Sequence, residues 1–198
     1  MSSTIPIRKG EEIDLEQLNA FFLKNNLNDT ISSIQQFSGG YSNLTYLLNS
    51  SSKKYVLRRP PAGAKAIKGG HDMAREYQLL CALQQAGFRE IPTPLVLGNE
   101  TDFLGVPFYI MAHVPGTILR ASDVPALIKE PDTALMRARS ENMCDKLVAL
   151  HAIDIEATGL IQIGKPEGYI KRQVEGWHNR YEKAKTDSLI AMEKVAQW

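Results

Sequence analysis

The strand pattern of the chain disappears after Gly116, and this change restricts the fold more than any other feature. Before Gly116, apolar and polar residues alternate in short runs such as 43–48, with the period of two that is typical of β-strands. After it, apolar residues recur at the spacing of helices. We therefore predict an α+β chain, with a small antiparallel-sheet lobe at residues 1–115 and a helical lobe at residues 116–198.

The same patterns predict the individual elements. We expect strands at residues 31–37, 43–48, 54–58, 95–97 and 106–114. We expect helices at residues 14–26, 71–86, 133–151, 169–185 and 189–198, with Asp14 capping the first and Gly87 ending the second. This order would give one antiparallel sheet with the helix at 71–86 packed on it.

The composition of the 198 residues indicates which binding partners and which cellular compartment to expect. Hydrophobic residues make up 43%, which is enough for a packed core. The 23 basic and 22 acidic residues nearly cancel, so we expect no nucleic-acid partner, because such partners require a basic surface. The chain has no run of about 20 apolar residues and no targeting pattern at its start, so we expect no membrane partner and a cytoplasmic protein. Cys81 and Cys144 are predicted to be buried free thiols.

The first candidate site feature is the glycine-containing segment between the first two predicted strands. It consists of Ser38, Gly39, Gly40, Tyr41, Ser42 and Asn43. Two adjacent glycines allow the backbone to approach a ligand closely and to direct N–H groups at phosphate oxygens. The alternative is an ordinary hairpin turn. Considered without its neighbours, the segment favours this hairpin turn over a phosphate-binding loop, because the strict pattern G-x-G-x-x-G is absent.

The second feature is a pair of opposite charges on neighbouring elements. In the third strand, Val56 and Arg58 share one face of the sheet, where the cation could reach nucleotide phosphates and Val56 could touch the base. Glu76 lies on the apolar face of the following helix, together with Leu80 and Leu83. A carboxylate on such a face needs a partner, so we predict a bidentate ion pair between Arg58 and Glu76. The alternative is that both charges face water.

The last predicted strand, at 106–114, is followed by Pro115 and Gly116 and could connect two lobes while its backbone binds an adenine edge. A plain core strand is the alternative. No two of the four histidines stand at metal-ligand spacing, so we interpret them as structural and expect no metal site within the chain. They are His71, His113, His151 and His178.

Three segments together resemble a known family: residues 39–46, residues 55–61 and the run Arg75-Glu76-Tyr77. They are similar to the aminoglycoside phosphotransferase and choline kinase-like superfamily, in the branch that is fused to acyl-CoA dehydrogenase domains in animals. The resemblance implies a protein-kinase-like fold, with a complete small lobe and an incomplete helical lobe. It also implies an ATP-dependent phosphotransferase that acts, with Mg2+, on a hydroxyl of a small metabolite.

The resemblance also implies roles for single residues. Arg58 takes the place of the phosphate-binding lysine of kinases, and Glu76 is its partner on the helix. Met111 takes the gatekeeper place, and the backbone of Ala112 and Val114 would bind adenine. These residues, with Val56 and the segment 38–43, are the predicted nucleotide site.

The sequence departs from the family at the catalytic residues. The family's H-G-D-x-x-x-x-N loop and its metal-binding aspartate are absent from the 198 residues, and we expect them beyond Trp198. We therefore predict no catalytic residue in this chain and no kinase activity for the chain alone. The alternative is a non-catalytic module, fragment-like or pseudokinase-like, that binds a nucleotide or a partner. A nucleotide-independent interaction domain is a further alternative.

Overall fold

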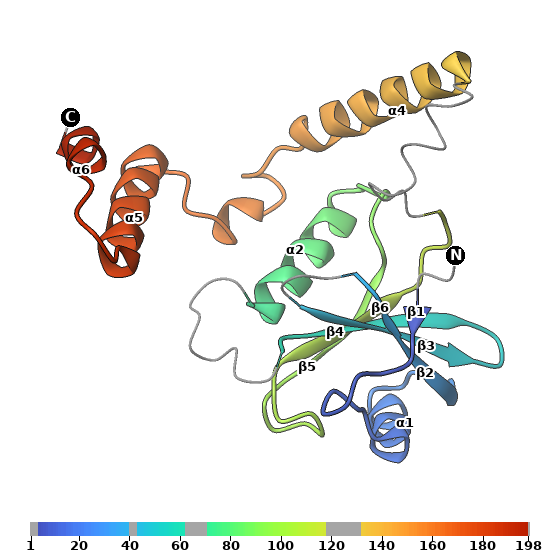
Figure 1. Ribbon diagram of the computed structural model, residues 1–198. Coiled ribbons are helices and arrows are strands. Elements are labelled where there is room, and N and C mark those ends of the chain that lie inside the picture. The colour runs from blue at the N-terminus through green and yellow to red at the C-terminus, as the bar shows by residue number, and fades with distance from the viewer. Residues whose placement is uncertain (1–3, 40–42, 62–70, 118–131, 198) are drawn as a thin grey trace.

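The centre of the structure is a six-stranded antiparallel sheet with a helix on each face, and further helices follow it (Figure 1). The computed structural model describes residues 4–39, 43–61, 71–117 and 132–197. The strands lie in the order β1-β2-β3-β4-β6-β5. Their bounds are β1 (Thr4–Ile5), β2 (Ile31–Phe37), β3 (Leu44–Ser50), β4 (Lys54–Arg59), β5 (Pro94–Gly98) and β6 (Phe108–Ala112).

The helices begin and end at the signals that the sequence contains. Their bounds are α1 (Leu15–Lys24), α2 (Met73–Gln85), α4 (Thr133–His151), the 3-10 helix η3 (Leu160–Gln162), α5 (Tyr169–Ala184) and α6 (Ile190–Gln197). Asp14 caps α1 by accepting a hydrogen bond from the Gln17 amide at 2.9 Å. Gly87, with a φ of +83°, ends α2. Each predicted helix and strand is confirmed to within two residues of its bounds.

The main core lies between the sheet and α1. Tyr46, Leu57 and Phe108 are fully buried on this face and belong to one cluster with Leu18 and Phe22 of α1. Burial of each such side chain stabilises the fold by about 1.5–3 kcal/mol. The prediction of one covering helix was therefore incomplete, since α1 covers the second face. The strand β1 was missed because two residues are too few to show an alternating pattern.

The other face of the sheet is covered by α2, which packs over β5 and β6 (Figure 1). Side chains alternate between the two faces along each strand. Because Leu57 and Ile110 belong to the α1 core, the flanking residues of β4 and β6 lie on the α2 face. The antiparallel register pairs Val56 with Met111, and Arg58 with Tyr109.

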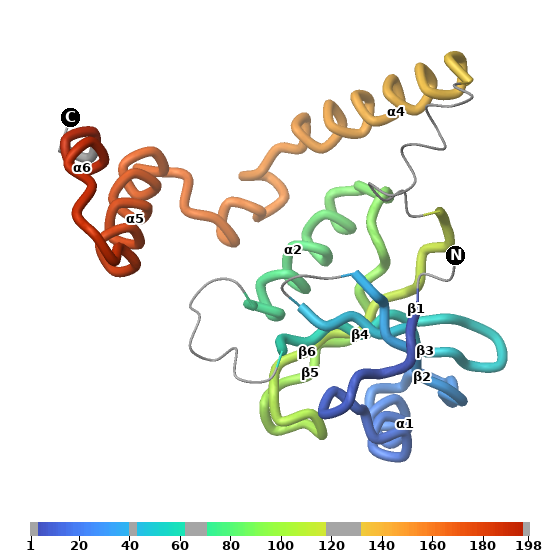
Figure 2. Tube along the Cα trace, in the orientation of Figure 1, coloured from blue at the N-terminus to red at the C-terminus, as the bar shows by residue number. Residues whose placement is uncertain are grey.

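The helices α4, α5 and α6 extend away from the sheet, and η3 contacts α2 (Figure 2). Many apolar side chains of these helices are exposed, among them Met143, Val148, Trp177 and Ile190. Cys144 is exposed as well, so the prediction of two buried thiols is wrong there, because no side chain of α4 is buried. Cys81 is half-buried, and both cysteines are free. The lobe boundary between residues 115 and 116 stays a prediction.

Within the described ranges, no helix combines the length and the apolar character that crossing a bilayer requires.

Candidate functional site

An ion pair joins the sheet to α2 at the predicted place. Arg58 Nε of β4 lies 3.3 Å from Glu76 Oε2 of α2, and the two side chains are 31% and 36% exposed. The predicted pairing of these residues is confirmed. The bidentate geometry is not, because the contact joins one nitrogen to one oxygen, and the buried Arg58 Nε makes no hydrogen bond within the described structure.

The Glu76 carboxylate is oriented by two further side chains. The Asn43 Nδ2 amide donates to Glu76 Oε1 at 3.1 Å, and the Tyr109 hydroxyl donates to Glu76 Oε2 at 3.0 Å. Burial raises the pKa of Tyr109, and the neighbouring Glu76 carboxylate raises it further, so the phenol stays a donor. Each oxygen of the carboxylate therefore has a donor other than Arg58.

An apolar patch lies beside the ion pair on the same face of the sheet. Val56 is buried and Met111 is half-buried, and the two are cross-strand neighbours. They stand two residues from Arg58 and Tyr109, which is about 7 Å along the strands. The face thus presents an apolar surface at one end and a guanidinium at the other. Such an arrangement can hold a flat apolar ring next to an anionic group.

The end of β6 is tied into the sheet through its backbone. The Ala112 amide donates to the Thr93 carbonyl at 2.9 Å, and the His113 amide donates to the Lys54 carbonyl at 3.1 Å. The Ala112 amide is therefore committed to the sheet, and only its carbonyl can serve a ligand. The side chain of Val114, just beyond the strand, is 60% exposed.

Part of the predicted site lies outside the described residues. Gly40, Tyr41 and Ser42 belong to this part, so the cover that we expected over the phosphates is not placed. The flanking Ser38 and Gly39 follow β2, and Asn43 precedes β3. The structure therefore brings together Asn43, Val56, Arg58, Glu76 and Met111.

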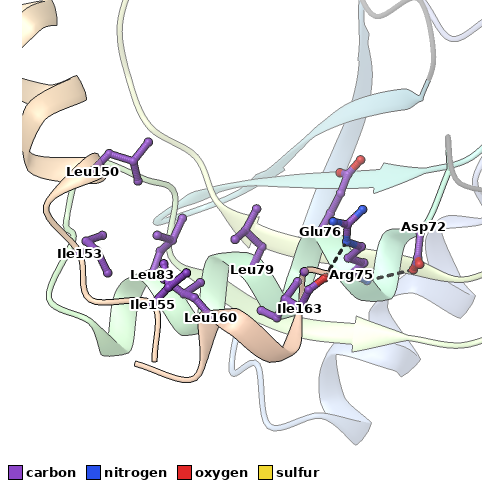
Figure 3. Close-up of a pocket in the computed structure, with 11 residues that line it drawn as sticks. Asp72, Arg75, Glu76, Leu79, Leu83, Leu150, Ile153, Ile155, Leu160 and Ile163 are labelled. Carbon is purple, nitrogen blue, oxygen red and sulfur yellow. Dashed lines mark hydrogen bonds between the residues drawn. The ribbon is translucent and has the colours of Figure 1, made fainter. Parts of the chain in front are cut away.

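A groove lies between α2 and residues 150–164. It has a volume of about 580 Å³ and is lined mainly by apolar side chains, among them Leu79, Leu83 and Ile153. Figure 3 shows the polar residues gathered at one end of it, where Arg75 Nε donates to the Ile163 carbonyl at 3.2 Å. The predicted nucleotide residues other than Glu76 do not line this groove.

No metal site accompanies the ion pair in the part of the chain that the structure covers. There, no three His, Cys, Asp or Glu side chains are grouped so that they could share an ion. The described residues therefore do not fit a magnesium centre, whereas the exposed part of the Arg58 guanidinium fits an anionic ligand.

Sequence reasoning missed two members of the cluster. Tyr109 was treated only as part of a connecting strand, although its alternation with Ile110 places it on the face of Arg58. His71 was interpreted as structural, yet its Nδ1 lies 2.7 Å from Asn43 Oδ1. The signal for His71 was weak, because it is separated from Asn43 by 28 positions.

The sheet, its two covering helices and the strand-to-helix ion pair define a protein-kinase-like α+β fold. Two solved structures share it. A proposed aminoglycoside phosphotransferase from Ralstonia eutropha JMP134 aligns with a TM-score of 0.66 at 28% identity, over 94% of this chain and 53% of that one. The GDP complex of aminoglycoside 2'-phosphotransferase-IIIa aligns with a TM-score of 0.59 at 22% identity, over 88% of this chain and 53% of that one, and supports the fold alone.

The chain belongs to the phosphotransferase enzyme family, whose profile matches residues 33–198. Acyl-CoA dehydrogenase family member 10 of Mus musculus is 34% identical over 199 residues, which are 99% of this chain and 18% of the relative. Acyl-CoA dehydrogenase family member 11 of Gallus gallus is 35% identical over 166 residues, which are 84% of this chain and 20% of the relative. The chain thus spans about a fifth of these curated relatives, and the predicted resemblance is confirmed.

Proposed function

We propose that this chain provides the nucleotide-binding part of a phosphotransferase that moves the γ-phosphate of ATP to a hydroxyl of a small metabolite. The observation that carries the proposal is the Arg58–Glu76 ion pair on the α2 face of the sheet. Membership of the phosphotransferase enzyme family supports the reaction class. One solved structure of the same fold is a GDP complex, and we propose that this chain likewise binds a purine nucleotide.

Each residue of the proposed site has one role. Arg58 binds the α- and β-phosphates, because its guanidinium is a fixed cation with several donors. Glu76 orients Arg58 and does not touch the nucleotide. Val56 and Met111 contact the base, and the segment 38–43 covers the phosphates.

The base edge would be bound by the end of β6. Since the Ala112 amide is used by Thr93, Ala112 contributes its carbonyl oxygen. Val114, two residues further on, contributes backbone groups of the same run. Adenine presents one donor and one acceptor on this edge, which such a pair of backbone groups matches.

Magnesium would accompany the nucleotide, and we assign it no ligand among the described residues. The 198 residues also contain no His-Gly-Asp run, the sequence that marks the catalytic loop in the family. Phosphoryl transfer depends on positioned metal and acidic groups as well as on phosphate binding. We therefore propose that the chain by itself does not turn ATP over.

The acceptor is proposed to be a small hydroxylated compound. The names of the curated relatives favour an acyl compound, whereas the solved structures are of aminoglycoside phosphotransferases. The net charge of +1 gives little attraction for a polycationic aminoglycoside, which favours the acyl compound.

Nucleotide binding without catalysis is the second candidate function, and the missing His-Gly-Asp run favours it. Both candidate functions require nucleotide binding, and calorimetric titration of the folded chain with ATP and with GTP tests it. We expect saturable binding, with a gain of about 2.7 kcal/mol in unfolding free energy at a hundredfold excess over Kd. A folded chain that binds neither nucleotide would point to the nucleotide-independent interaction domain.

Turnover of ATP by the chain alone would refute the proposed inactivity. A metabolite phosphorylation screen of the full-length gene product then separates the enzyme from the binding module.

A further inference from the structure

A chain of hydrogen bonds leads from His71 to the carboxylate of the ion pair. His71 Nδ1 lies 2.7 Å from Asn43 Oδ1, and Asn43 Nδ2 lies 3.1 Å from Glu76 Oε1. Asn43 is only 5% exposed, so both ends of its amide need partners, and both have one. We call this chain the His71–Asn43–Glu76 relay.

The donors and acceptors of the relay can be assigned in only one way. A carboxylate can only accept hydrogen bonds, so the Asn43 NH2 group must face Glu76. The Asn43 oxygen then faces His71, and since that oxygen can only accept, His71 Nδ1 must carry a proton. The opposite amide orientation would set the Asn43 oxygen against the Glu76 carboxylate, which are two acceptors.

The relay connects the two elements that border the phosphate end of the proposed site. Asn43 is the last residue of the glycine-containing segment and directly precedes β3. His71 directly precedes Asp72, whose side chain caps α2 by accepting from the Arg75 amide at 3.0 Å. Glu76 stands in the first turn of the same helix. The start of α2 is thereby fixed to the end of the glycine-containing segment.

We propose that Asn43 and His71 are positioning residues, which hold Glu76, and through it Arg58, in the geometry that binds nucleotide phosphates. This inference rests on the proposed function. Its basis is that Arg58 does not fix the carboxylate: the contact uses one nitrogen and lacks hydrogen-bond geometry. The orientation of Glu76 depends instead on Asn43 and Tyr109.

The relay affects one end of the ligand only. Asn43 and His71 act on the carboxylate beside Arg58, whereas the apolar patch for the base lies about 7 Å further along the strands. Loss of the relay should therefore weaken the binding of ATP and leave that of adenosine unchanged. A merely structural role would weaken both ligands alike, because it would disturb the whole face.

The test compares substitutions of His71 in the 198-residue chain. His71→Ala removes the donor, and we expect about tenfold weaker ATP binding, the loss of one hydrogen bond within a charged network. His71→Asn keeps an NH2 donor near the place of Nδ1 and should bind ATP like the wild type. Adenosine affinity, measured by ligand-observed NMR, should stay the same in both. Asn43→Ala should behave like His71→Ala, with Asn49→Ala, at the far end of β3, as the matched control.

A second measurement needs neither ligand nor substitution. At mildly alkaline pH, the imidazole 15N shifts of His71 should show a protonated Nδ1. An unprotonated Nδ1, equal ATP affinity of His71→Ala and wild type, or parallel losses of ATP and adenosine binding would each overturn the inference. A wild-type chain that binds neither ligand would overturn the proposed function and the positioning role, while the nitrogen shifts would still decide whether the relay exists.

Discussion

Tyr109 and Arg58 are cross-strand neighbours that reach the same oxygen of one carboxylate. The Tyr109 hydroxyl donates to Glu76 Oε2 at 3.0 Å, and Arg58 Nε lies 3.3 Å from that oxygen. A neutral donor and a cation thus share one acceptor between β6, β4 and α2. This geometry makes the anchoring of α2 on the sheet measurable by single substitutions.

Removal of the tyrosine hydroxyl should destabilise the protein. Tyr109→Phe keeps the buried ring next to Tyr77, at 6.2 Å between ring centroids, and deletes only the hydrogen bond. We expect a loss of about 1.5–3 kcal/mol in unfolding free energy, as for hydrogen bonds to charged groups. Urea denaturation measures it. Tyr169→Phe, at a ring that is 59% exposed, is the control, and equal effects of both would contradict the account.

Neutralising the Glu76 carboxylate should also lower the unfolding free energy. In Glu76→Gln, an NH2 group replaces one of the two carboxylate oxygens, so either Asn43 or Tyr109 loses its acceptor, and Arg58 loses its counter-charge. Because the pair is about a third exposed, we expect a loss of about 1–2 kcal/mol. Glu141→Gln breaks a surface pair with Arg137 on α4 and should cost less than about 0.5 kcal/mol. Chemical denaturation of the two variants should therefore differ; coinciding curves would speak against the anchoring role of Glu76.

The protein should lose stability in strong alkali partly through Tyr55. Burial raises the pKa of Tyr55 to about 12, and its hydrogen bond to the Asp29 carboxylate adds to the shift. The folded protein therefore holds this proton more tightly than the unfolded chain. The stability that it contributes is complete below a pH of about 10 and is lost as the pH rises through about 12.

Substitution of Tyr55 isolates this contribution, because burial also raises the pKa of Tyr46 and Tyr109. The difference in unfolding free energy between wild type and Tyr55→Phe should shrink as the pH rises above about 10. A difference that stays constant up to a pH of about 12 would show that Tyr55 titrates normally.

The close contact between β5 and β6 requires glycine at position 98. A Cβ on Gly98 would lie 2.2 Å from the Phe108 ring, which is fully buried in the α1 core. Gly98→Ala should therefore cost about 1–3 kcal/mol through overpacking. Gly176→Ala, in α5 with nothing within 4 Å of the new Cβ, should instead stabilise by up to about 1 kcal/mol. Thermal unfolding should show shifts of opposite sign, and equal shifts would contradict this packing.

Much of this fold could be predicted because its elements carry strong local signals. β2 and α4 have the predicted bounds, since each combines a regular hydrophobic period with clear breaks at both ends. The Arg58–Glu76 pair was predictable because a carboxylate on an apolar helix face requires a partner. The strand β1 could not be predicted, because the pairing of Thr4 with Phe37 is a tertiary contact without a local sequence pattern.

The candidate site was less accessible to sequence reasoning than the fold. Tyr109 and His71 reach the carboxylate from other elements, and only the strand register and the start of α2 bring them there. The prediction of a bidentate geometry was wrong, and the pairwise argument behind it did not include Asn43 and Tyr109, which also donate to the carboxylate.

The central claim is that Arg58, held against Glu76, binds the phosphates of a nucleotide. Calorimetric titration of the folded chain with ATP tests it most directly, in the wild type, in Arg58→Met and in Lys54→Met, a control that removes an exposed charge from the same strand. We predict at least about tenfold weaker binding for Arg58→Met and unchanged binding for Lys54→Met. Equal affinities of the wild type and Arg58→Met would contradict the account.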